Sequence, residues 1–121
     1  MAVVKPATYV VGVDLGGTKI LAGVFDAKLK PLGRTKLTTK SQRGPKAVME
    51  RITRCINDVV DECDLQPRQI VGVGIGAPGA SDPETGRVLF APNLPGWQNV
   101  PLKLTLEKAL GIPVFIENDC N

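Results

Sequence analysis

Apolar and polar positions alternate through the first third of the chain in a pattern typical of β-strands. A β-branched run at residues 9–15 is followed, after a Gly-Gly pair at residues 16–17, by a second apolar run at residues 19–25. Two strands joined at paired glycines predict a tight hairpin, because glycine readily adopts the positive φ angles that such turns need. Residues 26–33 predict the next turn, and residues 34–39 predict a third antiparallel strand.

Apolar residues then recur at spacings of three and four over residues 45–63. That period places them on one face of a helix, with charged residues on the opposite face. The helix is predicted to start at Pro45, where the missing backbone donor costs nothing, and to end within residues 64–69. Its apolar positions are Val48, Ile52, Cys55, Ile56, Val59, Val60 and Cys63.

Short apolar runs alternate with loops in the second half of the chain. Residues 70–75 are apolar at successive positions, which predicts a strand that is buried on both faces. The remaining elements are predicted as a loop at 78–86, a short strand at 88–90, a loop at 93–99, a helix at 101–110 and a last buried strand at 114–116.

The order of these elements, β-β-β-α-β-α-β, predicts the fold class. Three antiparallel strands followed by helix-linked parallel strands indicate an α/β domain that has a mixed sheet with helices on its faces. This order resembles the ribonuclease H-like unit, which forms one half of the actin-like ATPase and sugar kinase architecture. We therefore expect one such domain over residues 1–121.

Composition narrows the classes of function. With 121 residues, 43% of them hydrophobic and 22% charged, the chain is sized for one globular domain. No apolar run reaches the roughly 20 residues that span a bilayer, and the start lacks a signal peptide, so we expect a cytoplasmic protein. The net charge of +3 is not gathered in a basic stripe, which argues against a nucleic-acid partner.

The three cysteines, Cys55, Cys63 and Cys120, fit no zinc spacing. Cys55 and Cys63 would lie about 12 Å apart along one helix, which is too far for a disulfide. We interpret all three as reduced cysteines that serve as small apolar residues.

The sharpest candidate for chemistry is the segment from Asp14 to Lys19, whose sequence is DLGGTK. Its glycines let the backbone approach a bulky anion, and turned N–H groups form a concavity that binds phosphate oxygens. Thr18 adds a hydroxyl and Lys19 a cation, while Asp14 offers Mg²⁺ a carboxylate at the strand end. The alternative is an ordinary Gly-Gly hairpin.

Residues 74–79 satisfy the pattern G-x-G-x-x-G of dinucleotide-binding loops and follow a predicted strand. Such a loop must open directly into a helix, whereas the residues after Pro78 show no helical period. We therefore reject a dinucleotide site. Small residues at this strand end instead permit a ligand or a neighbouring backbone to come close, although a merely structural loop stays open.

The segment from Asn93 to Trp97 supplies an amide and the only tryptophan of the chain. Sugar hydroxyls need paired donors and acceptors, and the C–H face of a sugar packs on aromatic rings. A single tryptophan is more often part of the core or a loop anchor, and we favour that interpretation for Trp97. For Asn93, a sugar contact and a structural role both stay open.

Glu117, Asn118 and Asp119 follow the last predicted strand. A carboxylate at the carboxyl end of a buried parallel strand faces the crevice where α/β proteins bind ligands. It could accept the proton of an alcohol that attacks a γ-phosphoryl group, while Asn118 holds a neighbouring hydroxyl. The alternative is a helix N-cap, for which Asn and Asp are also preferred.

Four motifs in order, at residues 14–19, 74–79, 93–97 and 117–121, resemble the ROK family, whose name joins repressors, open reading frames and kinases. The resemblance covers residues 9–121 and is closest to the bacterial glucokinases of that family. It implies transfer of the γ-phosphoryl group of ATP to the 6-hydroxyl of glucose.

Each motif then acquires an implied role. The hairpin would meet the ATP phosphates through Asp14, Gly16, Gly17, Thr18 and Lys19, with Asp14 acting on Mg²⁺ through water. Asp119 would be the general base. The residues implied to bind the sugar are Gly79, Asn93, Asn118 and Asp119.

Two departures from the family pattern limit what the resemblance implies. The chain has Ala80 and Ser81 where the family often has Pro followed by Val or Ile, which loosens any inference about the hexose. The family's second half carries a zinc motif, His and Glu sugar ligands and the adenosine pocket, whereas this chain has no His. The resemblance therefore implies an N-terminal small domain that is inactive alone and belongs to a homodimer when complete.

Two alternatives accompany the glucokinase interpretation. One is a kinase for fructose, mannose or an N-acetylhexosamine. The other is a sugar-responsive ROK repressor, which is disfavoured because the first strand begins near Tyr9 and leaves no room for a helix-turn-helix before it.

Overall fold

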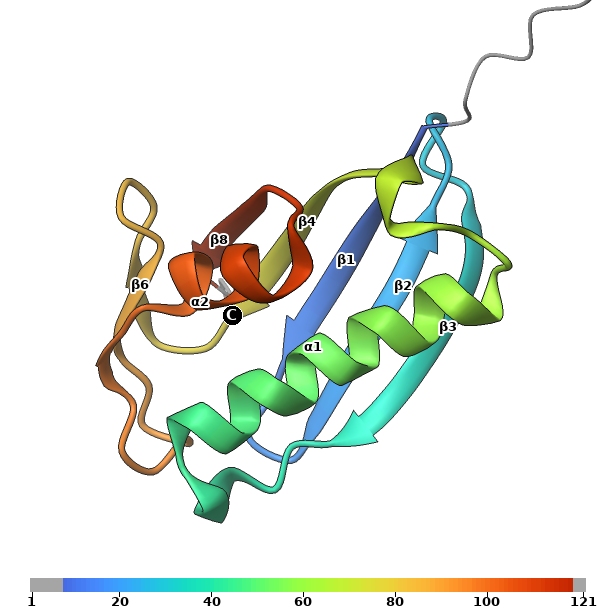
Figure 1. Ribbon diagram of the computed structural model, residues 1–121. Coiled ribbons are helices and arrows are strands. Elements are labelled where there is room, and N and C mark those ends of the chain that lie inside the picture. Colours follow the sequence, from blue (N-terminus) through green and yellow to red (C-terminus); the bar gives the residue numbers. More distant parts are fainter. Residues whose placement is uncertain (1–7, 119–121) are drawn as a thin grey trace, which may run out of the picture.

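The main sheet has five strands in the order β3-β2-β1-β4-β8 (Figure 1), in a computed structural model that describes residues 8–118. β2 is antiparallel to both of its neighbours, whereas β1, β4 and β8 are parallel to one another. This arrangement confirms the predicted mixed sheet and its ribonuclease H-like order. The strands are β1 Tyr9–Leu15, β2 Lys19–Phe25, β3 Pro31–Thr38, β4 Ile70–Ala77 and β8 Val114–Asn118.

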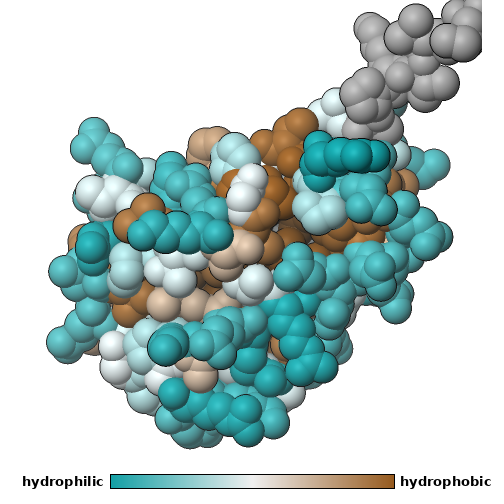
Figure 2. Space-filling model, viewed as in Figure 1, coloured by the Kyte–Doolittle hydropathy of each residue, from teal (hydrophilic) through white to brown (hydrophobic). Residues whose placement is uncertain are grey.

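Two α-helices cover the same face of this sheet (Figure 1): α1 Pro45–Glu62 and α2 Leu102–Leu110. α1 packs on β2 and β3, α2 packs on β8, and the two helices touch each other. Figure 2 shows apolar side chains in the gap between the two helices, with mostly hydrophilic atoms on their outer surfaces. The expected mixed sheet with packed helices is confirmed, and among the described residues α1 and α2 share one face of it. Neither helix is long and apolar enough to cross a membrane.

The one-sided helix layer explains the burial pattern of the strands. Val11, Val13 and Leu15 of β1 are buried under the helices, whereas Asp14 on the opposite face is exposed. The prediction that β4 is buried on both faces is wrong, because 53% of Val71 is exposed. An apolar run such as that of β4 is fully buried only when both faces of the sheet are covered, and here the helices cover one face.

The helix-free face carries a shallow groove of about 780 Å³. Gly12, Gly23 and Gly74 contribute to its lining, which keeps the backbone of the sheet accessible. The ring of Phe25 lies over two of these glycines, since a Cβ on Gly12 or Gly23 would stand 3.3 Å from it. Asp14 reaches the same groove from the carboxyl end of β1.

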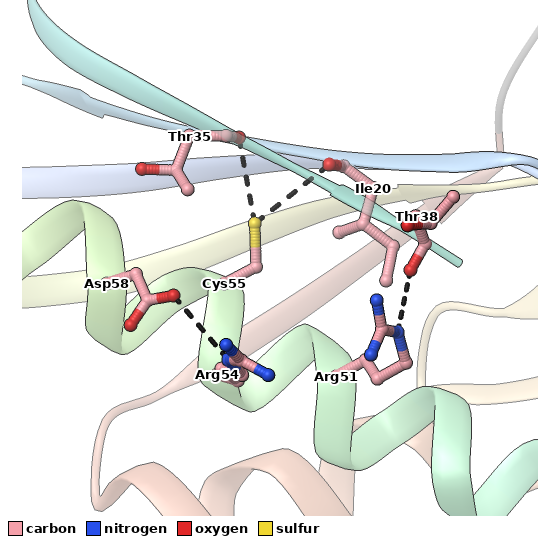
Figure 3. Close-up of polar contacts among 7 residues, drawn as sticks. All are labelled: Ile20, Thr35, Thr38, Arg51, Arg54, Cys55 and Asp58. Atoms are coloured by element: carbon pink, nitrogen blue, oxygen red, sulfur yellow. Dashed lines mark hydrogen bonds and ion pairs between the residues drawn. The ribbon is translucent and has the colours of Figure 1, made fainter. Parts of the chain in front are cut away.

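α1 is joined to the sheet by polar contacts as well as by its apolar face (Figure 3). The Cys55 thiol lies 3.6 Å from the backbone oxygen of Thr35 and 3.9 Å from that of Ile20. Arg51 donates from Nε to the backbone oxygen of Thr38 at 2.6 Å. The exposed pair between Arg54 and Asp58, at 3.8 Å, adds little because water screens it.

The remaining short elements differ most from the predictions. β5 Ala80–Asp82 and β7 Gln98–Val100 flank β6 Arg87–Phe90 in a second, three-stranded sheet. Only β6 was predicted; β5 and β7 are too short to show alternation. The 3-10 helices η1 Ser41–Arg43 and η2 Pro67–Gln69 flank α1.

β3 begins at Pro31 rather than at residue 34 because the preceding turn is tighter than predicted. The side-chain oxygen of Asp26 accepts hydrogen bonds from the amides of Lys28 and Lys30, both at 2.9 Å. Proline is tolerated at the start of β3 because β3 is an edge strand.

Candidate active site

The parallel strands β1, β4 and β8 bring three of the predicted motifs to one edge of the sheet. Asp14 of β1 is paired with Gly76 of β4, which is paired in turn with Glu117 of β8. One step further along, Ala77 is paired with Asn118. This is the edge at which ligands bind in α/β sheets, as the sequence predicted.

The turn between β1 and β2 presents backbone donors that the protein does not use. Gly16 donates from its amide to the carbonyl of Lys19 at 2.9 Å, which closes the base of the turn. Within residues 8–118 the amides of Gly17 and Thr18 make no hydrogen bond. Successive free amides in a turn form a concavity suited to the oxygens of an anion such as a phosphate.

Two charged side chains flank this turn. Asp14 precedes it and Lys19 follows it, and both are exposed. Neither forms an ion pair with another residue in the described part of the chain. Lys19 therefore keeps a free ammonium for an anion, and Asp14 keeps a free carboxylate.

A magnesium ion carried by a nucleotide fits a single carboxylate, because Mg²⁺ keeps several waters and takes other ligands from phosphate. Between residues 8 and 118 no three Asp, Glu, His or Cys side chains gather into a metal cluster. The donor set around Asp14 thus suits a metal that is bound mainly through a phosphate group.

The loop that contains Asn93 lies against the turn of the first hairpin. A Cβ built on Gly17 would stand 3.1 Å from the backbone oxygen of Asn93 and 3.2 Å from its Cβ. The side chain of Asn93 is exposed. The structure therefore brings the first and third of the four sequence motifs, residues 14–19 and 93–97, into direct contact.

Gly79 lies beside the same loop. Its φ is 81°, and a Cβ there would stand only 2.0 Å from the backbone oxygen of Phe90. After Gly79 the chain enters β5, which pairs with β6, and not a helix. The rejection of a dinucleotide-binding loop is confirmed.

Trp97 holds this loop to the protein interior. Only 1% of its surface is exposed, and Leu94 beside it is buried as well. The amide of Trp97 donates to the carbonyl of Leu94 at 3.2 Å, and its carbonyl accepts from the amide of Ala91 at 3.3 Å. The expectation that Trp97 is a loop anchor is confirmed. Its buried indole N–H has no partner among the described residues.

β8 supplies the last predicted motif. Its first amide, on Val114, donates to the carboxylate of Glu107 on α2 at 2.9 Å, which fixes the strand to the helix. Glu117 is exposed near the strand's end, and Asn118 is its last residue. Asp119, the predicted base, lies outside the described residues, so its role stays a prediction that the direction of β8 supports.

Thr39 is a further residue of this site, although the sequence pattern predicts it only as the end of a strand. Its hydroxyl donates to the carbonyl of Gly16 at 2.8 Å, and its amide donates to the carbonyl of Thr18 at 2.8 Å. Thr39 and the turn are 23 residues apart in the sequence, so no local sequence pattern predicts the hydrogen bonds between them.

Known proteins resemble this chain over nearly its whole length. The sequence profile of the ROK family matches residues 10–121. The glucokinase of Thermotoga maritima is 40% identical over 116 residues, which cover 96% of this chain and 35% of that relative. The glucokinase of Streptomyces coelicolor is 40% identical over 111 residues, which cover 92% and 32%. The chain therefore spans about a third of the length of these relatives.

Solved structures agree with the sequence matches. A ROK hexokinase from Thermus thermophilus has a TM-score of 0.83 and 39% identity, covering 94% of this chain and 36% of that protein. A ROK family glucokinase from Streptomyces griseus, solved with glucose and AMPPNP, has a TM-score of 0.80 and 37% identity, covering 93% and 34%.

Relatives with other functions match as well. An N-acetyl-D-glucosamine kinase of Pectobacterium atrosepticum is 37% identical over 110 residues, covering 91% of this chain and 34% of the relative. A putative xylose repressor of Caldicellulosiruptor is 30% identical over 117 residues, covering 97% and 29%.

Proposed function

Because the chain belongs to the ROK family, we propose that it supplies the phosphate-binding and sugar-binding third of an ATP-dependent hexose kinase. Its proposed reaction is transfer of the γ-phosphoryl group of ATP to the 6-hydroxyl of glucose. The choice of glucose follows the glucokinases of Thermotoga and Streptomyces among its relatives. As a third of such an enzyme, the 121-residue chain is expected to have no turnover alone.

The observation that carries this proposal is the pair of unused amides at Gly17 and Thr18, at the edge where β8 leads toward Asp119. Phosphoryl transfer depends on holding donor and acceptor in line and on stabilising the charge of the phosphates. Free amides, together with Lys19, are donors for phosphate oxygens. Gly16 and Gly17 let the backbone come close to them.

The acceptor side of the reaction is assigned to the loops beside the turn. We propose that Gly79, Asn93 and Asn118 contact the sugar. Asp119 is proposed to accept the proton of the attacking hydroxyl, a task for a carboxylate within hydrogen-bond reach of that oxygen. The contact between Gly17 and Asn93 supports this proposal, because it sets the phosphate side and the sugar side next to each other.

Asp14 is proposed to hold Mg²⁺, through a water molecule. The ion would neutralise charge that develops on the transferring phosphoryl group. The exposed carboxylate of Asp14 directly before the turn is the residue that fits this task.

The test of this function uses the extended protein, by which we mean this chain continued to the length of its relatives. We expect glucose 6-phosphate from ATP, Mg²⁺ and glucose in a coupled assay. Fructose, mannose and N-acetylglucosamine are the competing acceptors, the last because an N-acetyl-D-glucosamine kinase is among the relatives. Preference for another sugar would correct the substrate, and failure to phosphorylate any sugar would refute the kinase.

The extended protein is further expected to be a homodimer and to bind no DNA. A putative xylose repressor among the relatives makes DNA binding worth measuring. Tight, sequence-specific binding at physiological salt would favour a repressor over a kinase.

A further inference from the structure

Thr39 occupies an unusual place for a polar side chain. It is the first residue after β3, and its exposed surface is 0%. Across residues 8–118 no other side chain that carries a hydroxyl, an amide or a charge is buried. A buried hydroxyl must be hydrogen-bonded to be tolerated, so its partners define what it does.

Both partners of Thr39 belong to the turn between β1 and β2. The hydroxyl donates to the carbonyl of Gly16, and the amide donates to the carbonyl of Thr18, each at 2.8 Å. In a simple hairpin Gly16 and Lys19 would exchange two hydrogen bonds. Here the amide of Gly16 bonds to Lys19, whereas the Gly16 carbonyl accepts from Thr39 and not from the amide of Lys19.

The direction of a carbonyl fixes the direction of the next amide. A trans peptide is planar, so its C=O and its N–H point to opposite sides. With the Gly16 carbonyl held by the buried Thr39, the amide of Gly17 must point away from the interior. The Thr39 amide likewise holds the Thr18 carbonyl, and this orients the amide of the next residue, Lys19, away from Thr39.

We propose that Thr39 is a positioning residue that aims the free amide of Gly17, at the start of the turn, at the phosphate chain of the nucleotide. This inference rests on the proposed function, in which that turn binds the ATP phosphates. Thr39 does not touch the ligand. It prevents the turn from closing into an ordinary hairpin, in which the Gly16 carbonyl would accept from Lys19 and the Gly17 amide would rotate.

A second contact fixes the segment that carries Thr39. Arg51 of α1 donates to the carbonyl of the preceding residue, Thr38, at 2.6 Å (Figure 3). The following residue, Lys40, has a φ of 52° and leads into η1. The segment whose residue Thr39 holds the turn is therefore fixed by α1 as well as by β3.

The experiment compares Thr39→Val, which removes the hydroxyl at nearly constant volume, with Thr39→Ser, which keeps it. Thr53→Val is the matched control: the Thr53 hydroxyl donates within α1, to the carbonyl of Met49 at 3.0 Å, away from the turn. All three are made in the 121-residue chain labelled with ¹⁵N. Melting curves and spectral dispersion first establish that each variant is folded.

The first readout is the backbone order parameter of residues 16–18 without ligand. We expect Thr39→Val to lower it from about 0.85, typical of rigid backbone, to below about 0.6. Thr39→Ser and Thr53→Val should leave it unchanged. An equally rigid turn with unchanged amide shifts in Thr39→Val would overturn the inference.

The second readout is the shift of the Gly17 and Thr18 amides on titration with Mg·ATP, measured with the same variants made in the extended protein. We expect about tenfold weaker binding in Thr39→Val, the effect of misdirecting one hydrogen bond, and binding within about twofold of wild type in the other two variants. If Mg·ATP does not shift the wild-type amide signals of Gly17 and Thr18, the proposed function of the turn is refuted. The order parameters would still decide the role of Thr39. Undiminished binding by Thr39→Val would refute that role alone.

Discussion

The backbone of Gly17 lies directly against Asn93, so that a Cβ on Gly17 would stand 3.1 Å from the Asn93 carbonyl oxygen. This contact joins the proposed phosphate side to the proposed sugar side. Gly17→Ala should therefore push turn and loop apart by a few tenths of an ångström. In the extended protein we expect the KM for ATP and the KM for glucose to rise together, each by about tenfold for a mild overpacking of about 1.4 kcal/mol.

Steady-state kinetics with each substrate varied in turn measures this effect. Gly74→Ala in the 121-residue chain is the control for adding a methyl group, since no atom lies within 4 Å of its Cβ position. Its unfolding free energy should not fall. A change confined to the KM for ATP would show that the turn and the loop act independently.

Gly79→Ala should be among the most destabilising single methyl additions in the chain. Its φ of 81° strains any other residue, and the new Cβ would stand 2.0 Å from the Phe90 carbonyl oxygen. Gly111 has a similar φ of 69° but nothing within 4 Å, so Gly111→Ala isolates the cost of the backbone conformation. We expect about 1–2 kcal/mol for Gly111→Ala and about 1–3 kcal/mol more for Gly79→Ala.

Urea unfolding of the two variants and the wild-type chain gives both numbers. Equal losses would mean that the segment at Phe90 moves aside without cost, and that the tight contact is not a constraint on the sugar loop.

Asp119→Asn in the extended protein tests the proposed base. The amide keeps the size and a hydrogen bond to the sugar but does not accept a proton from the attacking hydroxyl. We expect kcat to fall by about 10²–10⁴-fold, while the KM for glucose changes little. Rapid-quench measurement of the chemical step supplies the rate. Wild-type turnover in this variant would remove Asp119 from the mechanism.

Cys55 should make the fold sensitive to alkaline pH. Burial, with a further contribution from Asp58, raises the pKa of the Cys55 thiol above its ordinary value of 9.0. The folded state thus holds the thiol proton more tightly than the unfolded state. This contribution to stability is complete below pH 9.0 and is lost as the pH rises through the folded pKa.

Unfolding free energies of the wild-type chain and of Cys55→Ala, taken from pH 7 upward, measure that contribution. We expect the wild type to lose stability more steeply above pH 9.0 than the variant. Parallel curves would show that Cys55 ionises equally easily in both states.

Much of the fold was predictable because its signals are local. The regular apolar spacing of α1 acts within a few residues, and this helix was predicted. The hairpin of β1 and β2 was predicted as well, but its stated reason was wrong, because neither Gly16 nor Gly17 has a positive φ. β5 and β7 were missed because three residues cannot display a period, and their pairing with β6 is a tertiary effect. The sequence of one strand likewise does not reveal whether both faces of its sheet are covered. Val71 lies in an apolar run and is nevertheless exposed.

The candidate site divides in the same way. The motif residues Asp14, Gly79 and Asn93 were identified because their side chains or glycines form recognisable patterns. The contact of Gly17 with Asn93 and the clamp by Thr39 were not, because each joins segments that the chain brings together only on folding. A threonine that ends a strand looks the same whether its hydroxyl meets water or a buried carbonyl.

The order of the strands also sets the order in which the chain can fold. β1, β2 and β3 pair with their sequence neighbours, whereas β1 must await β4, and β4 must await β8, across the intervening helices. Pairing of parallel strands that are distant in the sequence is slow, because the entropy of closing the loop is lost before the stabilising contacts form. During refolding the amides of β2 should thus gain protection from hydrogen exchange before those of β8. A half-folded molecule would already display the turn at Gly17 while the strand that leads to Asp119 is still free.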